Sequence, residues 1–262
     1  MTTRWILVLA GVGLLLAAGG CPQPSATDSP AVNRPIRVVT LNTLGCQRAS
    51  PQRIAEAIAA HRPDIVFLQE ARAAQVDELA RLLGLHRATT DPLVQPGDHL
   101  ETAVLAREPL TDVALLRTDV RAFAVSARLR LAGRDLRVVS AHLTSTHPER
   151  VRRIPWTMQQ RAAEGRLLAE AAEGWAEPTI IGGDFNDAAD STALRPLTRR
   201  FEHAWDRAGR GSSITYPGFL GGVHIDHVFY TRGLEAVDGF VDPADVSDHR
   251  MLVVELTSAP TP

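Results

Sequence analysis

The chain has 262 residues, of which 45% are hydrophobic and 22% are charged, which is ordinary for a soluble globular protein of one or two domains. Its formal net charge is -2 at pH 7. This balance excludes a strong global field that would attract nucleic acid, although it does not exclude local basic patches.

The first residues have the pattern of an export signal. Arg4 precedes a long apolar run, and the small residues from Ala18 to Gly20 precede Cys21; the run is short for a membrane span. The ending AAGGC resembles a bacterial lipobox, although Ala18 stands where that motif usually has a large aliphatic residue. We predict a signal peptide at residues 1–21 and lipidation of Cys21. The domain would then be anchored to the outer face of a bacterial membrane. An uncleaved anchor, or a periplasmic or secreted protein, is the alternative.

A tether and then a single domain are predicted after the signal. Residues 22–35 are rich in Pro, Ser, Thr and Ala and have no apolar periodicity, which indicates a flexible segment. The predicted domain spans residues 36–258, and residues 259–262 form a tail. Its first strand, IRVVTLNT, ends at Asn42, and SPQRIAEAIAAH predicts a helix capped by Ser50.

The middle of the chain alternates between both element types. DIVFLQE predicts a buried strand that ends at the charged Glu70, and a helix of about ten residues follows. Successive strand-like runs extend from Thr102 to Leu143, with Gly133 at a hairpin turn. A polar loop after His142 then leads into a helix from about Thr157 to Trp175.

The last third of the chain returns to short strands. Thr179 to Ile181 predict a buried strand that opens into the loop GGDFND. ITYP and VHIDHVFYT also have the pattern of strands, and VSDHR precedes a last apolar strand. No repeat or linker interrupts residues 36–258, so we expect one mixed α/β domain.

Polar residues that do not suit a buried strand stand at the ends of these predicted strands. They are Asn42, Glu70, His142, Asp184, Asn186, Asp226, Asp248 and His249. A single buried polar residue is often satisfied structurally, but so many at strand ends are hard to explain in that way. In layered α/β folds, strand ends converge on one edge and form sites from separate segments.

The segments that carry these residues resemble the endonuclease/exonuclease/phosphatase superfamily, which includes deoxyribonuclease I, exonuclease III, inositol polyphosphate 5-phosphatases and bacterial sphingomyelinases. The matching segments are VVTLNT, DIVFLQE, VVSAHLTS, IIGGDFND, IDHVFY and SDHRMLVVEL, in the family's order. The resemblance implies a deoxyribonuclease I-like α/β fold. This is a four-layer sandwich of two mostly antiparallel sheets flanked by helices, with the site at one edge.

The resemblance also implies a metal site and a water-activating group. Glu70 would be the principal ligand of a divalent cation, Mg²⁺ with Mn²⁺ as a substitute, and Asn42 and Asp248 would supply further oxygen donors. Asp184 would orient or deprotonate the attacking water. Asn186 would hold a phosphoryl oxygen of the substrate.

The histidines receive different expectations. His249 would contact the phosphate while Asp226 fixes its tautomer, and His142 would assist the phosphate or the leaving group. Arg161, in the helix after the polar loop, is a candidate substrate ligand. A packed strand position is expected for His227, and surface or loop positions are expected for His147, His203 and His224.

The predicted function is hydrolysis of phosphodiester bonds by metal-assisted attack of water, with nuclease-like activity favoured. The alternatives are a phosphatase or phospholipase C-type enzyme that acts on inositol phosphates or phospholipid head groups, and an inactive binding protein on the same fold. Retention of Glu70, Asp184 and His249 argues against the inactive protein. Contact with a membrane would come from the lipid anchor, and no obligate protein partner is inferred.

Overall fold

The computed structural model describes residues 34–89, 101–146, 152–218 and 221–259, which belong to the compact unit Val32–Pro262. The predicted signal peptide with Cys21, most of the predicted tether, His147 and residues 260–262 lie outside the described residues. Within the described ranges, no helix combines the length and the apolar character that a membrane crossing requires.

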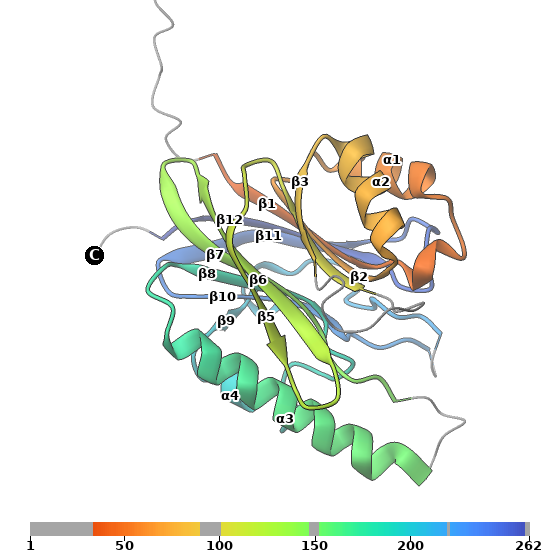
Figure 1. Ribbon diagram of the computed structural model, residues 1–262, viewed down its shortest axis with the longest axis vertical. Coiled ribbons are helices and arrows are strands. Elements are labelled where there is room, and N and C mark those ends of the chain that lie inside the picture. The colour runs from red at the N-terminus through yellow and green to blue at the C-terminus, as the bar shows by residue number, and fades with distance from the viewer. Residues whose placement is uncertain (1–33, 90–100, 147–151, 219–220, 260–262) are drawn as a thin grey trace, which may run out of the picture. The chain divides into compact units, whose positions relative to one another are not determined.

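Two sheets of six strands each form the centre of the described domain (Figure 1). The strands are β1 Ile36–Asn42, β2 Ile65–Ala71, β3 His86–Thr89, β4 Glu101–Ala106, β5 Thr111–Arg117, β6 Ala122–Leu131, β7 Arg134–His142, β8 Thr179–Asp184, β9 Glu202–His203, β10 Asp226–Tyr230, β11 Leu234–Asp242 and β12 Met251–Ser258. The first sheet has the order β11-β12-β1-β2-β4-β3 and the second has the order β5-β6-β7-β8-β10-β9. One pair in each sheet is parallel, β1 with β2 and β7 with β8; the other described pairs are antiparallel.

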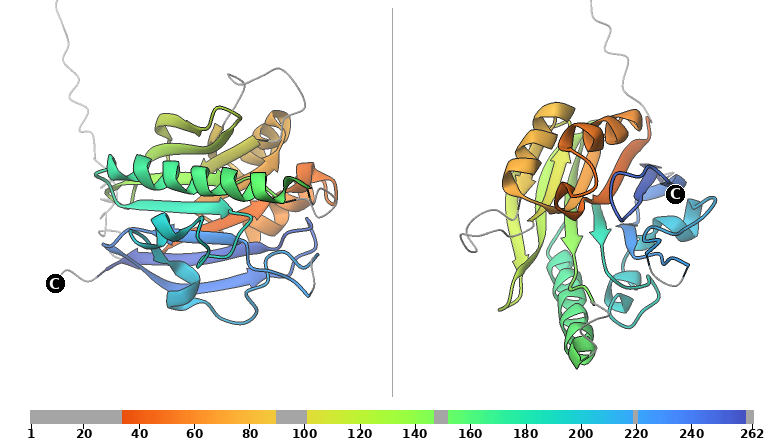
Figure 2. Two further views of the ribbon diagram at one scale, coloured as in Figure 1. Left: turned by 90° about the horizontal axis from the view of Figure 1, so that it is seen from below. Right: turned by 90° about the vertical axis from the view of Figure 1, so that its right-hand side faces the viewer.

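Helices cover the outer faces of both sheets (Figures 1 and 2). They are α1 Pro51–Ala60, α2 Ala73–Leu83, α3 Ile154–Glu173 and α4 Arg195–Thr198. A further helix, α5 Ala204–Ala208, packs against the central core instead, and a 3-10 turn spans Leu44–Cys46. Apolar residues of α1 and α2 pack on the outer face of the first sheet, and those of α3 pack on the second. The predicted four-layer sandwich of mostly antiparallel sheets is therefore confirmed.

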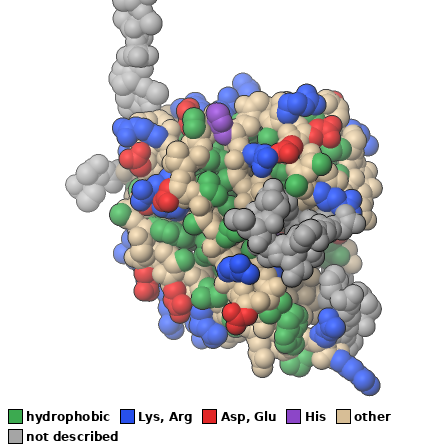
Figure 3. Space-filling view, in the orientation of Figure 1, with side chains coloured by type: hydrophobic (Ala, Val, Ile, Leu, Met, Phe, Trp, Pro, Cys, Tyr) green, Lys and Arg blue, Asp and Glu red, His purple; other side chains and the backbone are tan. Residues whose placement is uncertain are grey.

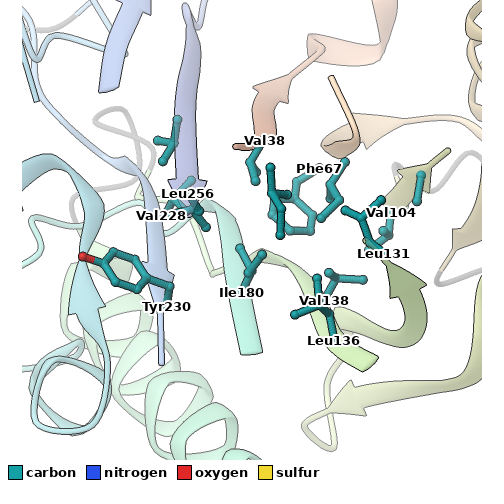
Figure 4. Packing of buried hydrophobic residues seen from close by; sticks show 14 of the residues in the cluster. Val38, Phe67, Val104, Leu131, Leu136, Val138, Ile180, Val228, Tyr230 and Leu256 are labelled. Carbon is teal, nitrogen blue, oxygen red and sulfur yellow. The ribbon is translucent and has the colours of Figure 1, made fainter. Parts of the chain in front are cut away.

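The central core lies between the two sheets (Figure 4). Val38, Phe67, Val138 and Ile180 come from the parallel pairs of the two sheets and are fully buried there. Their chain neighbours, such as Val39, point to the helical layers instead. Because both faces of these strands are covered, their sequences are continuous apolar runs without alternation.

One strand prediction is wrong. Residues 214–217, ITYP, form no strand; the structure has only an isolated bridge between Tyr216 and Val223. β10 also begins later than predicted, at Asp226. The hydroxyl of Thr215 accepts a hydrogen bond from the Asp226 N–H at 3.1 Å. The Thr215 side chain thus satisfies a backbone N–H group that would otherwise need a neighbouring strand as its partner.

The strands β3, β9 and β11 were not predicted. Each of them lies at an edge of its sheet. An edge strand has one partner and an exposed flank, so its sequence carries little of the apolar pattern that marks a central strand. Asp238 and Gly239 in β11 illustrate this.

Two glycines allow β8 to pass close to its neighbours. A Cβ atom on Gly183, whose φ is +151°, would lie 1.8 Å from the backbone oxygen of Ala141 in β7. A Cβ atom on Gly182 would lie 2.3 Å from the ring of Phe67 in the facing sheet. Any larger residue would therefore push β8 away from β7 or separate the sheets directly below Asp184.

We expect Gly183→Ala to lower the free energy of unfolding by about 2–4 kcal/mol, because the new methyl group meets rigid backbone. Urea unfolding measures the effect. Gly174→Ala is the control, since its Cβ atom would lie 3.6 Å from the nearest atom, which is an ordinary contact. Equal losses of stability in both variants would contradict this account of β8.

Candidate active site

Strand ends from both sheets meet at one edge of the sandwich. β1 ends at Asn42, β7 ends at His142 and β8 ends at Asp184. His142 is in register with Asp184, and Asp184 with Asp226 at the start of β10. The parallel pairing of β7 with β8 and the antiparallel pairing of β8 with β10 thus bring these side chains to the edge that the strand pattern of the sequence indicated.

Glu70 reaches this edge because β2 contains a bulge. The pairing of β2 with β4 shifts between Gln69 and Ala71, and Glu70 has a φ of +54°, which is uncommon for a residue other than glycine. The Thr43 hydroxyl donates to the Glu70 carbonyl oxygen at 2.9 Å and holds the bulge. Bulges re-aim side chains in this way beside functional sites.

A single amide holds two carboxylates together. Asn42 is buried, and its Nδ2 donates to Glu70 Oε1 and to Asp184 Oδ2, both at 3.0 Å. Its Oδ1 accepts from the Leu44 N–H at 3.0 Å. In this arrangement Asn42 positions the two carboxylates with its nitrogen, and its role as a metal ligand stays a prediction.

His142 lies against the same two carboxylates. Its Nε2 is 3.6 Å from Glu70 Oε1 and 3.7 Å from Asp184 Oδ2, and it has no hydrogen-bond partner. Burial, together with the charges of Arg121 and His249, holds the pKa of His142 well below its usual value. The ring is therefore neutral near pH 7.

These groups fit a divalent cation. Glu70, His142 and Asp184 each offer a ligand atom, and the three atoms lie within 4.8 Å of one another. Two carboxylates at this separation repel each other, and an ion such as Mg²⁺ prefers carboxylate oxygens. Asp248 belongs to none of the His/Cys/Asp/Glu clusters among the described residues; its Oδ1 accepts from the Ser247 hydroxyl at 3.2 Å. Its role as a ligand stays a prediction.

A third carboxylate, Asp226, and His249 lie next to Asp184. His249 Nδ1 is 2.8 Å from Asp226 Oδ2, and His249 Nε2 is 3.7 Å from Asp184 Oδ2. Burial lowers the pKa of His249, but the charges of Asp226 and Asp184 outweigh burial and raise it above its usual value. Burial and the charge of Asp226 raise the pKa of Asp184.

The loop after β8 is fixed by its own polar side chains. The Asn186 N–H donates to Asp184 Oδ1 at 2.9 Å, and Asn186 Nδ2 donates to the Leu143 carbonyl oxygen at 3.0 Å. Asn186 has a φ of +52°, which asparagine tolerates better than most residues. The amide thus lies next to Asp184, and its contact with a phosphoryl oxygen stays a prediction.

Arg161 is largely committed to internal contacts. Its Nε donates to Asp187 Oδ2 at 3.2 Å, and its Nη1 donates to the Thr144 carbonyl oxygen at 3.0 Å and to Thr146 Oγ1 at 2.7 Å. It therefore ties the loop after β7 to the loop after β8. Contact with substrate stays a prediction for this residue.

A pocket beside this site was not anticipated from the sequence. It has a volume of about 210 Å³ and is lined by Arg121, Thr144, Ser145, Thr146, Arg153, Trp156 and Thr157. Arg121 Nη2 donates to the backbone oxygen of His142 at 2.7 Å, which connects the pocket to the catalytic edge. Arg121 belongs to the turn between β5 and β6, where the sequence has no local signal for a site.

The chain matches a family model and several solved structures. Residues 39–249 match the model of the endonuclease/exonuclease/phosphatase family. A protein described as endonuclease/exonuclease/phosphatase from Beutenbergia cavernae is 21% identical with a TM-score of 0.71, over 87% of this chain and 73% of its own. TDP2 of D. rerio, solved in complex with a single strand DNA product, is 18% identical with a TM-score of 0.68, over 85% of this chain and 98% of its own.

A family protein from Bacteroides vulgatus is 18% identical with a TM-score of 0.69, over 86% of this chain and all of its own. No curated protein sequence matches the chain. The solved structures share its fold, and the family model covers most of its length. The chain therefore belongs to the endonuclease/exonuclease/phosphatase family and is a metal-dependent hydrolase of phosphate esters.

Proposed function

We propose that this protein hydrolyses phosphodiester bonds with a bound Mg²⁺, and that a nucleic acid strand is its substrate. The observation that carries the proposal is the pair of carboxylates, Glu70 and Asp184, joined by one amide of Asn42 at the edge of both sheets. This arrangement supplies a cation site next to a buried carboxylate that can accept a proton.

The cation and the side chains would have different roles in the reaction. Glu70 would hold Mg²⁺, with Asn42 and Asp248 as further donors, and the ion would neutralise charge on the phosphoryl oxygens. Asp184, whose pKa is raised by burial and by Asp226, would accept the proton of the water that attacks phosphorus. The bond from phosphorus to the leaving oxygen would then break, and the leaving oxygen would take a proton from water.

His249 would stabilise the transition state by charge. Asp226 and Asp184 raise the pKa of His249 despite burial, so the ring is cationic at neutral pH. Its Nδ1–H donates to Asp226 Oδ2 at 2.8 Å, which leaves the Nε2–H to donate to a phosphoryl oxygen. A fixed hydrogen-bond donor stabilises the transition state more strongly in a buried site than it would in water.

The pocket next to His142 favours a nucleic acid strand. Arg121 and Arg153 can contact phosphates, and the exposed ring of Trp156 can stack on a base. Across the face shown in Figure 3, basic and acidic side chains of the described residues are interspersed. Because the formal net charge of the chain is also -2, recognition would depend on this local pocket and not on a strong overall positive charge. A similar protein, TDP2 of D. rerio, was solved with a single strand DNA product.

We expect Asp184→Asn and His249→Ala to lower the rate of bis-p-nitrophenyl phosphate hydrolysis by about 10²- to 10⁴-fold, because each removes a group that acts on the transition state. EDTA should abolish turnover and Mg²⁺ should restore it. Asp190→Asn is the control, since Asp190 is exposed in the same loop. Turnover that survives EDTA and both substitutions would refute the mechanism.

We expect Trp156→Ala to raise KM for a single-stranded oligonucleotide by about tenfold. The substitution removes a ring on which a base can stack, and one stacked base contributes about 1–3 kcal/mol to binding. Met158→Ala is the control, because Met158 is exposed on the same helix. The assay uses DNA, RNA, sphingomyelin and inositol phosphates in parallel. A KM that does not change in Trp156→Ala, or turnover of lipid or inositol phosphate alone, would argue against a nucleic acid substrate.

We also propose that the protein is exported and carries a lipid on Cys21. The support is the lipobox-like ending AAGGC after an apolar run. Mass spectrometry of the mature N-terminus should find Cys21 as the first residue with an acyl modification, and globomycin should block its processing. Mature protein with an unmodified Cys21 would refute lipidation.

A further inference from the structure

Three histidines form a cluster outside the catalytic site. They are His203 at the end of β9, His224 just before β10 and His227 within β10. The expectation that His203 lies at the surface is wrong: 7% of His203 and 1% of His227 are exposed, and His224 is half-buried. Ring centroids are 4.5 Å apart for His224 and His227 and 5.0 Å apart for His203 and His227. One ligand nitrogen of each ring lies within 4.8 Å of the others.

The cluster faces away from the catalytic carboxylates. Asp226 and His227 are consecutive in β10, so their side chains point to opposite faces of the sheet. The His227 ring contacts Phe185 and Phe229, which belong to the core under α3. The cluster is therefore distinct from the site at Glu70 and Asp184.

Two neutral rings can make both hydrogen bonds of this cluster, but they cannot also place a proton in the contact with Asp206. His227 Nε2 lies 2.9 Å from the Asp187 carbonyl oxygen, and His227 Nδ1 lies 3.1 Å from His203 Nε2. His203 Nδ1 lies 3.1 Å from Asp206 Oδ2, close but not aligned as a hydrogen bond. The first two contacts are hydrogen bonds that need one proton each, and the third would need a further proton or another cation between its two atoms. Two neutral imidazoles supply one proton each.

The position of the His203 proton decides how the two rings interact. The Asp187 carbonyl oxygen places the His227 proton on Nε2, and the His203 proton lies either on Nε2, in the bond to His227, or on Nδ1, toward the Asp206 carboxylate. In the second tautomer, the lone pairs of His227 Nδ1 and His203 Nε2 face each other at 3.1 Å. His224 Nε2 is a third nitrogen that is buried without a hydrogen-bond partner.

In the second tautomer, a metal ion suits the three free nitrogens better than a further proton. Burial lowers the pKa of all three rings, which disfavours an imidazolium within the cluster. Histidines that bind metals nearly always donate their other N–H to a carbonyl or a carboxylate. The Asp187 carbonyl oxygen stands in that position for His227, and the Asp206 carboxylate stands there for His203.

We propose that His203 Nε2, His224 Nε2 and His227 Nδ1 bind one transition-metal ion of the Zn²⁺ class. Zn²⁺ binds imidazole nitrogen at about 2.0–2.1 Å, which separates two ligand nitrogens by about 3.4 Å in a tetrahedral site. The observed 3.1 Å between two of them is close to this value. Imidazole ligands suit Zn²⁺, Cu²⁺ or Ni²⁺, whereas Mg²⁺ prefers oxygen. A water molecule would complete the coordination on the half-buried side of His224.

The proposed ion would stabilise the loop that carries the catalytic side chains. His227 contacts the backbone of Asp187, the residue that follows Asn186 in the loop after β8. Asp187 also accepts a hydrogen bond from Arg161. An ion on His227 would fix its proton on Nε2 and so strengthen the bond to this loop.

The test is Zn²⁺ binding to the full-length protein after metals are removed with a chelator. With excess Mg²⁺ present to occupy the catalytic carboxylates, wild-type protein should bind one equivalent of Zn²⁺, and Co²⁺ in its place should give the visible absorption of a four-coordinate ion. Zn²⁺ at a hundredfold excess over Kd should raise Tm by about 5–10 °C. Glu70→Gln should bind Zn²⁺ as tightly as wild type, which separates this site from the catalytic one.

Variants of the cluster make the test specific. His224→Gln and His203→Gln should weaken Zn²⁺ binding by at least about 100-fold. Mutation of a group that hydrogen-bonds to a metal ligand lowers metal affinity by about 10- to 100-fold, and removal of the ligand itself should lower it further. His86→Gln is the control, because His86 is exposed in β3. His224 is half-buried, so its variant should fold even if His203→Gln does not.

Three results would overturn the proposal. One is Zn²⁺ affinity that is unchanged in folded His224→Gln. Another is loss of the bound ion in Glu70→Gln, which would place the ion at the catalytic carboxylates. The third is wild-type protein that binds no Zn²⁺. None of these results depends on the phosphodiesterase activity, so failure of the zinc site and failure of the proposed function are distinguishable.

Discussion

The catalytic edge depends on two carboxylates that are held close together by one buried amide. Asn42 Nδ2 donates to both Glu70 and Asp184 at 3.0 Å. Confining two negative charges in this way is costly unless donors or a cation compensate them. The amide, the cationic His249 and a bound divalent ion each reduce that cost. The repulsion between the two carboxylates makes the edge attractive to a metal ion. Burial and the charge of Asp226 raise the pKa of Asp184.

The backbone is shaped to maintain this arrangement. Glu70 and Asn186 have positive φ values, which are strained for most residues and recur at functional sites. Gly182 and Gly183 let β8 approach Phe67 and Ala141 within distances that no side chain could occupy. The buried core between the two sheets holds the strands in place and so maintains this strained backbone.

Much of this edge was predictable because the signal is local. Continuous apolar runs mark central strands, and a polar residue at the end of each run marks the edge where they meet. Asn42, Glu70, His142, Asp184, Asp226 and His249 all have this signal, and the structure brings them together. The bulge at Glu70 has no such signal, although it is what turns the carboxylate toward the site.

Features that depend on contacts between distant segments were not predictable. Arg121 joins the site through the backbone of His142, and Arg161 is engaged by two loops. His203 is buried because β9 pairs with β10, and a strand of two residues carries no periodic pattern. The apolar run around His227 indicated a packed residue, but nothing in the sequence showed that two further histidines pack beside it.

Anomalous diffraction from crystals soaked in Mn²⁺ would test the central claim most directly. The account predicts an Mn²⁺ peak in contact with the carboxylate of Glu70, beside Asp184. Absence of a peak at these carboxylates, in crystals whose other parts match the structure, would contradict the claim that they form the metal site of this enzyme.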